Sequence, residues 1–142
     1  MCSENVNNHD PSLTQSIVWN CPHKIFHQNI MSLRFKMNEL LCHLNHDPPN
    51  ILCITEHHLR HEELAAFHVE NYVLGSSHCR QLKLKGGVCI FVQNNLKFTP
   101  LNVDEYCVDQ DIEVCAIHLH STHNKLCILA IYRSPQENFN TF

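Results

Sequence analysis

One carboxylate at the end of a short apolar run has the clearest potential for chemistry in this chain. The run Ile51–Thr55 has the composition of a buried strand, and Glu56 follows it directly. A carboxylate at the end of a buried strand costs free energy unless a donor, a cation or a metal ion balances its charge. Glu56 is therefore either a capping or ion-paired residue or a metal ligand.

Three histidines close to Glu56 raise the question of zinc. His57 and His61 have the i, i+4 spacing that places two ligands on one face of a helix. The sequence shows no third ligand at a standard spacing and no zincin motif. We therefore interpret His57, His58 and His61 as solvated loop residues.

A small basic cluster precedes a pair of glycines. Arg80, Lys83 and Lys85 stand just before Gly86–Gly87, and such a cluster can contact a nucleic-acid backbone. The formal net charge of −4 argues against a generic polyanion-binding surface and favours a solvated hairpin loop. The glycines indicate a turn and not a phosphate loop, because no helix is expected after them.

Three segments carry a resemblance when they are taken in their order along the chain. They are residues 29–40, residues 51–59 and residues 131–135, and a strand-like run at 86–92 lies between the last two. Together they resemble the endonuclease/exonuclease/phosphatase superfamily. The likeness is greatest to the apurinic-type endonuclease domain of non-LTR (LINE-like) retrotransposons, and it covers roughly residues 25–142.

The resemblance implies a role for three residues. Glu56 corresponds to the metal-binding Glu of the family, Asn29 to an Asn that orients that carboxylate or the scissile phosphate, and Tyr132 to a Tyr that hydrogen-bonds the phosphate. The implied cofactor is Mg²⁺, with Mn²⁺ as an alternative, and a Glu is a suitable hard ligand for it. The implied partners are a DNA substrate and a reverse-transcriptase domain in a full-length polyprotein, and the implied location is the nucleus.

Two family elements have no counterpart in this sequence. An Asp-x-Asn element and a later Asp-His pair would both fall beyond Phe142. Loss of a general base alone slows catalysis by about 10² to 10⁴, so we expect a C-terminally truncated endonuclease fragment that is inactive as an isolated chain. Two alternatives stay open, namely a degenerate non-catalytic relic or binding module, and a phosphatase or exonuclease of the same superfamily.

The elements that must position these residues follow from hydrophobic spacing. Apolar residues at i, i+4, i+7 and i+11 predict a helix from Leu33 to Leu44, with Ser32 as its N-cap and Asp47-Pro48-Pro49 as its stop. A short helical turn is expected at Glu62–Phe67. Strands are predicted at 25–30, 51–55, 72–79, 88–92, 115–120 and 126–132, with a turn at His123–Asn124.

This order of elements predicts an α/β fold. The resemblance implies part of a four-layer α/β/β/α sandwich that is incomplete, with residues 1–24 as an irregular leader and residues 25–142 as the domain. The run Leu126–Tyr132 is continuously apolar, so we expect it to be buried on both faces.

Composition points to the inside of a cell. The chain is 44% hydrophobic, which favours a globular domain over disorder. It has 9 Cys, an odd number, with no secretory signal and no apolar stretch long enough for a membrane span. These features favour a reduced, intracellular setting.

Overall fold

A mixed four-stranded sheet carries the first half of the fold. The computed structural model describes residues 23–83, 85–120 and 125–135. The strand order is β1-β2-β4-β3, with β1 at Ile25–Asn29, β2 at Ile51–Thr55, β3 at Tyr72–His78 and β4 at Val88–Gln93. β1 and β2 are parallel, whereas β4 runs antiparallel to both of its neighbours.

Helix α1 provides the crossover that the parallel pair β1 and β2 needs. It spans Leu33–His46, and its buried residues Leu33, Leu40 and Leu44 have the helical spacing expected from the sequence. Ser32 takes the N-cap position as expected, but its side chain makes no capping hydrogen bond. With a φ of 91° at Ser32, the backbone has no ordinary capping geometry.

A second sheet is antiparallel and contains three strands in the order β5-β6-β7. They are β5 at Phe98–Leu101, β6 at Ile112–His120 and β7 at Lys125–Arg133, and a 3₁₀ turn, η1, lies at Asp104–Tyr106. The expected strands at 115–120 and 126–132 are thus present and slightly longer. The expected turn at His123–Asn124 lies outside the described residues, as does most of the leader.

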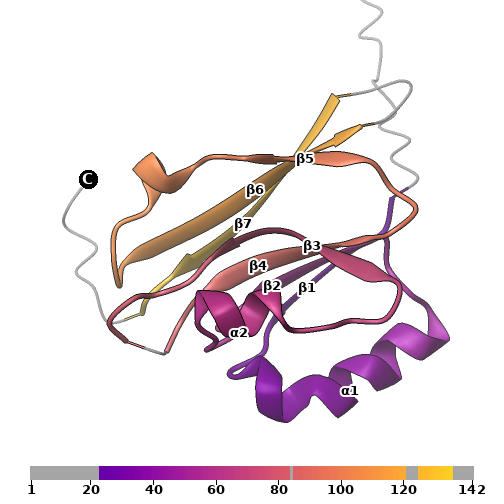
Figure 1. Ribbon diagram of the computed structural model, residues 1–142, viewed down its shortest axis with the longest axis horizontal. Coiled ribbons are helices and arrows are strands. Elements are labelled where there is room, and N and C mark those ends of the chain that lie inside the picture. Colours follow the sequence, from indigo (N-terminus) through magenta and orange to yellow (C-terminus); the bar gives the residue numbers. More distant parts are fainter. Residues whose placement is uncertain (1–22, 84, 121–124, 136–142) are drawn as a thin grey trace, which may run out of the picture.

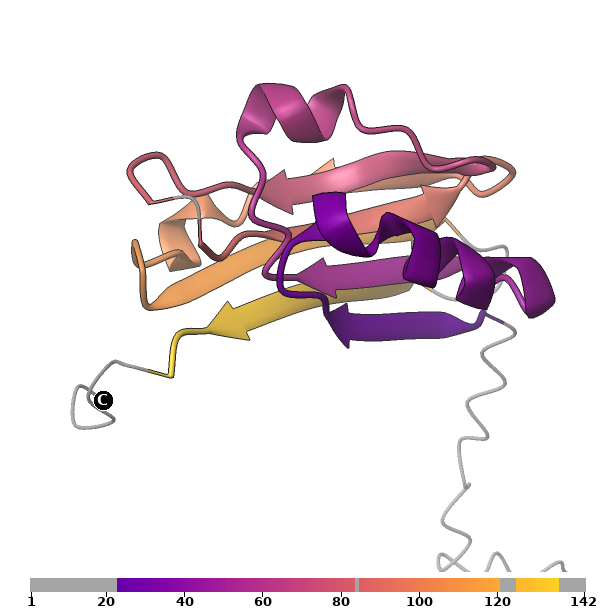
Figure 2. The ribbon, with the colours of Figure 1, turned by 90° about the horizontal axis from the view of Figure 1, so that it is seen from below.

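The two sheets pack face to face, and helices cover the outer face of the first sheet (Figures 1 and 2). One core lies between the sheets, and a second core lies beneath α1 and the short helix α2 at His61–Ala65. The arrangement confirms the α/β class with two packed sheets. In the described ranges the layers are helix, sheet and sheet.

The outer face of β7 differs from the expectation. Ile128 and Ala130 point into the core, but Leu129 and Ile131 are 50% and 56% exposed, so the prediction that this run is buried on both faces is wrong. The physical reason is that no α-helix among the described residues covers this face of the second sheet. A hollow of about 470 Å³ lies between β1 and β7 and includes Ile25 and Ile131 in its lining.

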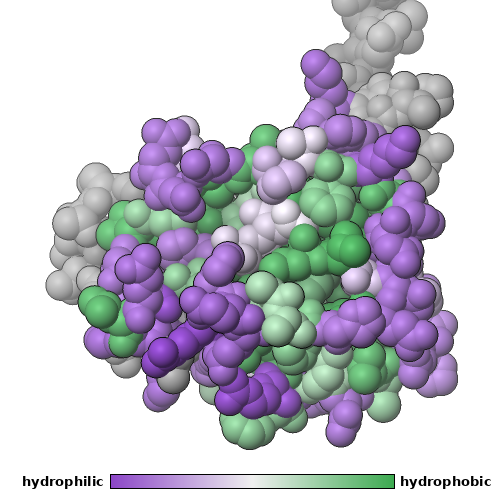
Figure 3. Space-filling model, in the orientation of Figure 1, coloured by the Kyte–Doolittle hydropathy of each residue, from purple (hydrophilic) through white to green (hydrophobic). Residues whose placement is uncertain are grey.

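The opposite side of the sandwich has β3 and β5 as its edge strands. Figure 3 shows this side, where hydrophobic surface between the two sheets is surrounded by hydrophilic side chains. No helix in the described part of the chain is long and apolar enough to cross a membrane.

Candidate functional site

The parallel pairing of β1 and β2 brings Asn29 and Glu56 together. Asn29 is the last residue of β1 and pairs in register with Thr55, the last residue of β2. Because parallel strands end at the same edge of a sheet, Glu56 emerges next to Asn29. The Asn29 Nδ2 donates a hydrogen bond of 2.8 Å to the Glu56 Oε1.

Loops after these strands hold Glu56 in a strained backbone conformation. The φ angles of Met31, Ser32, Glu56 and His58 are all positive, between 47° and 91°. Such a left-handed conformation costs a non-glycine residue on the order of 1–3 kcal/mol, and it persists only where the surroundings enforce it. Here hydrogen bonds between loops do so, for example Ser32 N–H to Glu56 O at 2.8 Å and His58 N–H to Gly86 O at 3.0 Å.

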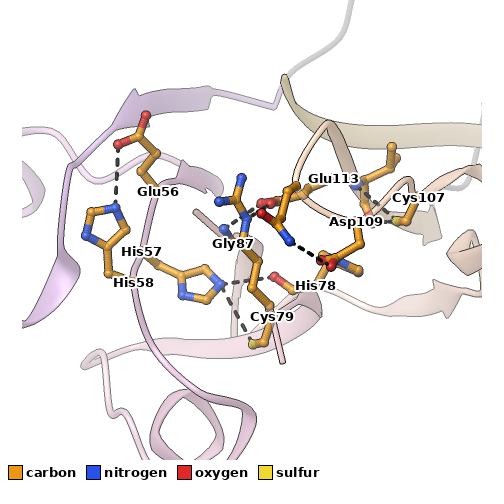
Figure 4. A network of polar contacts seen from close by, with 12 residues as sticks. Glu56, His57, His58, His78, Cys79, Gly87, Cys107, Asp109 and Glu113 are labelled. Atoms are coloured by element: carbon orange, nitrogen blue, oxygen red, sulfur yellow. Dashed lines mark hydrogen bonds and ion pairs between the residues drawn. The ribbon is translucent and has the colours of Figure 1, made fainter. Parts of the chain in front are cut away.

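Three polar side chains lie around the Glu56 carboxylate, and Asn29 is the first of them. The hydroxyl of Tyr132 donates a hydrogen bond to it, and His58 Nε2 lies 3.5 Å from its second oxygen, a pair drawn in Figure 4. Partial burial raises the pKa of Glu56, but the donors Asn29 and Tyr132 and the nearby His58 outweigh it, so the pKa is lower than normal. The carboxylate is therefore ionised at neutral pH, and its side chain remains 18% exposed.

Tyr132 reaches this site from the other sheet. It lies near the end of β7, opposite Glu113 of β6 in the register. Partial burial and the bond to anionic Glu56 raise the pKa of Tyr132 to about 12. Its hydroxyl therefore stays protonated at neutral pH and acts as a donor.

A cleft of about 360 Å³ opens beside Glu56 and Tyr132. All three residues of the basic cluster line the cleft. Among its described lining residues Glu56 is the one carboxylate. The cleft is therefore an electropositive pocket with a single anionic position. Its lining consists of Glu56, Arg80, Lys83, Lys85, Gly86, Gln110, Tyr132, Ser134 and Pro135.

The Arg80 side chain is largely buried and not solvated, so the interpretation of the basic cluster is wrong for it. Its side chain is 9% exposed and forms an ion pair with Glu113, whose side chain is fully buried. The other Glu113 oxygen accepts a hydrogen bond of 2.5 Å from Gly87 N–H. The Arg80 guanidinium lies over the Tyr132 ring, 5.9 Å from its centroid.

His57 is also buried, which corrects its interpretation as a solvated loop histidine. Its Nδ1 accepts a hydrogen bond of 3.0 Å from Leu59 N–H, and its Nε2 lies 3.2 Å from the His78 carbonyl oxygen (Figure 4). Burial lowers the pKa of His57 to about 4. Because α2 begins only at His61, His57 and His61 do not share a helix.

Zinc and Mg²⁺, the two metals that the sequence suggests, require different sets of ligands. The described residues contain no group of three or more His, Cys, Asp or Glu side chains placed to hold one ion, so they do not suit a structural zinc site. Mg²⁺ differs, because it is commonly held by one or two carboxylates and keeps several water ligands. An ionised, partly exposed Glu56 beside a polar cleft fits that mode of binding.

The structure brings Asn29, Glu56 and Tyr132 to one place, although they lie far apart in the sequence. The resemblance supplied these three residues together. Sequence reasoning did not find the pair of Arg80 and Glu113. A signal for it exists, because Glu113 is a carboxylate within a strand-forming run, and such a group needs a partner.

Comparison with known proteins gives a likeness among solved structures. No family model matches the chain, and no curated protein matches it. Among solved structures, the chain is similar to a variant of the 3′ phosphatase NExo from Neisseria, bound to a product DNA hairpin. The identity is 19%, the TM-score is 0.47, and the match covers 74% of this chain and 40% of that one.

Proposed function

We propose that this chain carries the metal-binding and phosphate-binding part of a Mg²⁺-dependent DNA endonuclease site. One observation supports the proposal above the others. Glu56 is held by Asn29 and Tyr132 at the wall of a cleft whose other charged lining residues are cations. A phosphodiester presents a negative charge that suits the cations, and a divalent ion suits the carboxylate.

Each residue has a separate role in this proposal. Glu56 holds Mg²⁺, or Mn²⁺ in its place, and the bound ion supplies Lewis-acid stabilisation of a phosphoryl oxygen. Asn29 fixes the orientation of the carboxylate through its 2.8 Å hydrogen bond. Tyr132 donates its proton to Glu56 in the free protein and is placed to donate to a phosphate oxygen in the cleft.

The same geometry favours binding over rapid cutting. Among the described lining residues no second carboxylate is present to act as a general base for water. We therefore propose that the isolated chain binds DNA and a divalent ion but nicks DNA slowly or not at all. A non-catalytic binding module is the second candidate function. The lack of a second carboxylate among the described lining residues favours it.

A metal titration tests the role of Glu56. Mn²⁺ binding to the 142-residue chain is measured by water-proton relaxation, and Glu56→Gln is compared with Glu39→Gln, an exposed glutamate on α1. We expect Glu56→Gln to weaken Mn²⁺ binding by at least about tenfold, because a charged oxygen ligand is lost, and Glu39→Gln to leave it unchanged. Equal Mn²⁺ affinity in all three proteins would refute the assignment.

A supercoiled-plasmid assay with Mg²⁺ separates the two candidate functions. Nicking by the wild-type chain that is lost in Glu56→Gln supports an endonuclease. DNA binding without nicking in either protein supports the binding module. Nicking that is equal in both would refute a catalytic metal at Glu56.

The origin of the chain is a proposal of its own. The resemblance supports a non-LTR retrotransposon source, a reverse-transcriptase domain in the same polyprotein and a nuclear site of action. Sequencing the reading frame downstream of Phe142 tests it. A Gly-Asp-Phe-Asn-like element followed by a Ser-Asp-His-like element supports the proposal, and an unrelated continuation contradicts it.

A further inference from the structure

The ion pair between Arg80 and Glu113 leaves part of the guanidinium unused. The Glu113 carboxylate accepts from the Arg80 Nε with one oxygen and from Gly87 N–H with the other. The Arg80 Nη2 is buried and has no hydrogen-bond partner among the described residues. A buried guanidinium nitrogen without an acceptor is costly, so such a group calls for an explanation.

The local backbone keeps this guanidinium against the cleft. A Cβ atom at Gly86 would overlap the Arg80 guanidinium, so only a glycine allows the close approach. The guanidinium also lies over the Tyr132 ring. Gly86 and Tyr132 both line the cleft together with Arg80, so the unused donor lies at the wall of the cleft.

Two exposed lysines complete the positive wall. Lys83 and Lys85 line the same cleft, and both are exposed. Arg80 differs from them because its charge is fixed in place by Glu113, whereas the lysines stand on flexible stems. A fixed planar donor combined with mobile point charges suits a tetrahedral oxyanion, for which Arg gives directed hydrogen bonds and Lys gives charge.

We propose that Arg80, Lys83 and Lys85 form a phosphate-binding subsite in the cleft beside Glu56 and Tyr132, and that Glu113 is the residue that positions Arg80. The subsite binds the anion without any metal ion. It deepens the proposed function, because the choice of phosphate as the ligand rests on that function.

Titration with inorganic phosphate in the presence of EDTA tests the subsite. Binding is followed at neutral pH and low ionic strength through the backbone amides of Gly86 and Gly87 and the Nε–H resonance of Arg80. Sulfate in place of phosphate reports on a general anion site. A short DNA oligonucleotide then shows whether a phosphate within a nucleic-acid backbone reaches the same resonances.

Paired variants make the test specific. Lys83→Ser with Lys85→Ser is compared with Lys36→Ser with Lys97→Ser, which removes the same charge from exposed positions elsewhere. We expect the first pair to weaken phosphate binding by about tenfold and the control pair to change it little. Arg80→Gln with Glu113→Gln should weaken binding by roughly 10- to 100-fold, because a charged hydrogen bond is lost.

The outcomes separate this proposal from the proposed function. Phosphate binding in EDTA without any Mn²⁺ site supports the subsite and removes the metal-dependent function. Mn²⁺ binding at Glu56 without phosphate-dependent shifts overturns the subsite alone. An equal loss of binding in both lysine pairs also overturns it, and this comparison remains decisive if the Arg80 and Glu113 variant does not fold.

Discussion

Glu56 and Glu113 lie close to the same cleft, but their surroundings differ in charge and in access to solvent. Glu113 is fully buried and is bound by a cation, Arg80, and by a backbone N–H. Glu56 is 18% exposed and is bound mainly by the neutral donors Asn29 and Tyr132. Both glutamates follow the rule that a carboxylate in a protein interior needs partners.

The kind of partner decides what else a carboxylate can bind. Arg80 neutralises Glu113, and the two Glu113 oxygens are both occupied, so no charge remains for a further ligand. Asn29 and Tyr132 orient Glu56 without cancelling its charge, and the cleft leaves room beside it. The comparison thus assigns a structural role to Glu113, whereas Glu56 remains able to hold a cation.

The largest expected effect comes from breaking the buried pair. Arg80→Ala leaves the Glu113 carboxylate buried without its cation, and such a loss costs about 3–5 kcal/mol of the free energy of unfolding. Replacing both partners, as in Arg80→Met with Glu113→Leu, removes the uncompensated charge and should restore most of the stability. Urea denaturation at neutral pH measures both proteins.

The matched control for this experiment is Glu56→Gln, which changes the other carboxylate. A double variant as unstable as Arg80→Ala would show that the packing of Arg80 matters more than its charge. A stability loss for Glu56→Gln as large as that for Arg80→Ala would show that the fold depends equally on the charges of the two glutamates.

A second effect concerns His57, whose ring lies against Gly87, the residue whose N–H donates to Glu113. A Cβ at Gly87 would overlap the His57 ring, which shows how tightly the ring is enclosed. Its pKa falls from 6.5 to about 4 on folding, so the unfolded chain binds more protons between these two pH values. Stability should therefore decrease as the pH falls through this range, by up to about 3 kcal/mol in total.

The free energy of unfolding at pH 7, 6 and 5 measures this loss. Protonation of the Nδ1 would also remove the acceptor for Leu59 N–H. His57→Gln offers one donor and one acceptor without titrating, so its stability should depend less on pH than that of the wild-type chain. Identical slopes in the two proteins would exclude His57 as the source.

Much of the architecture was accessible from local sequence patterns. The helical spacing of Leu33, Leu40 and Leu44 predicted α1, and short apolar runs predicted β2 and β4, because burial imposes these periods directly. The outer face of β7 could not be predicted in this way. An apolar run shows which side chains a strand can bury, but it does not show whether another layer covers them. Leu129 and Ile131 are exposed for this reason.

Some residues of the site could be predicted from the sequence and others could not, for a physical reason. The position of Glu56 after an apolar run marked it as a candidate, but its grouping with Asn29 and Tyr132 came from a resemblance. Their proximity depends on pairing between distant strands that no local pattern shows. Arg80 was assigned to a solvated loop because its partner, Glu113, is 33 residues away. Glu113, like Glu56, is a carboxylate beside apolar strand residues and needs a partner, and this need points to a cation such as Arg80.

A smaller effect on stability is expected at Glu56 itself. Glu56→Gln keeps an oxygen that can accept from Asn29 but removes the charge that the fold stabilises, so it should cost about 1 kcal/mol. The sign follows from the pKa of Glu56, which is lower in the folded chain than in the unfolded chain. The ionised carboxylate therefore stabilises the folded state above the unfolded pKa, and this stabilisation is lost as the pH falls. Urea denaturation of Glu56→Gln beside Glu39→Gln measures the difference, and equal stability of the two variants would contradict it.

The smallest effect on stability is expected for Tyr132→Phe. This variant should change the surroundings of Glu56 and leave those of Glu113 unchanged. The variant removes the hydroxyl that donates to Glu56 but keeps the ring that lies against Arg80. The pKa of Glu56 should therefore rise towards its ordinary value, since a donor to the ionised form is lost. Stability at neutral pH should change by only about 0.5–1 kcal/mol. Titration of the Glu56 carboxyl carbon by NMR measures the pKa, and an unchanged value would show that Tyr132 does not act on Glu56. The resonances of Arg80 and Glu113 should stay in place, because the ring that packs against the ion pair remains.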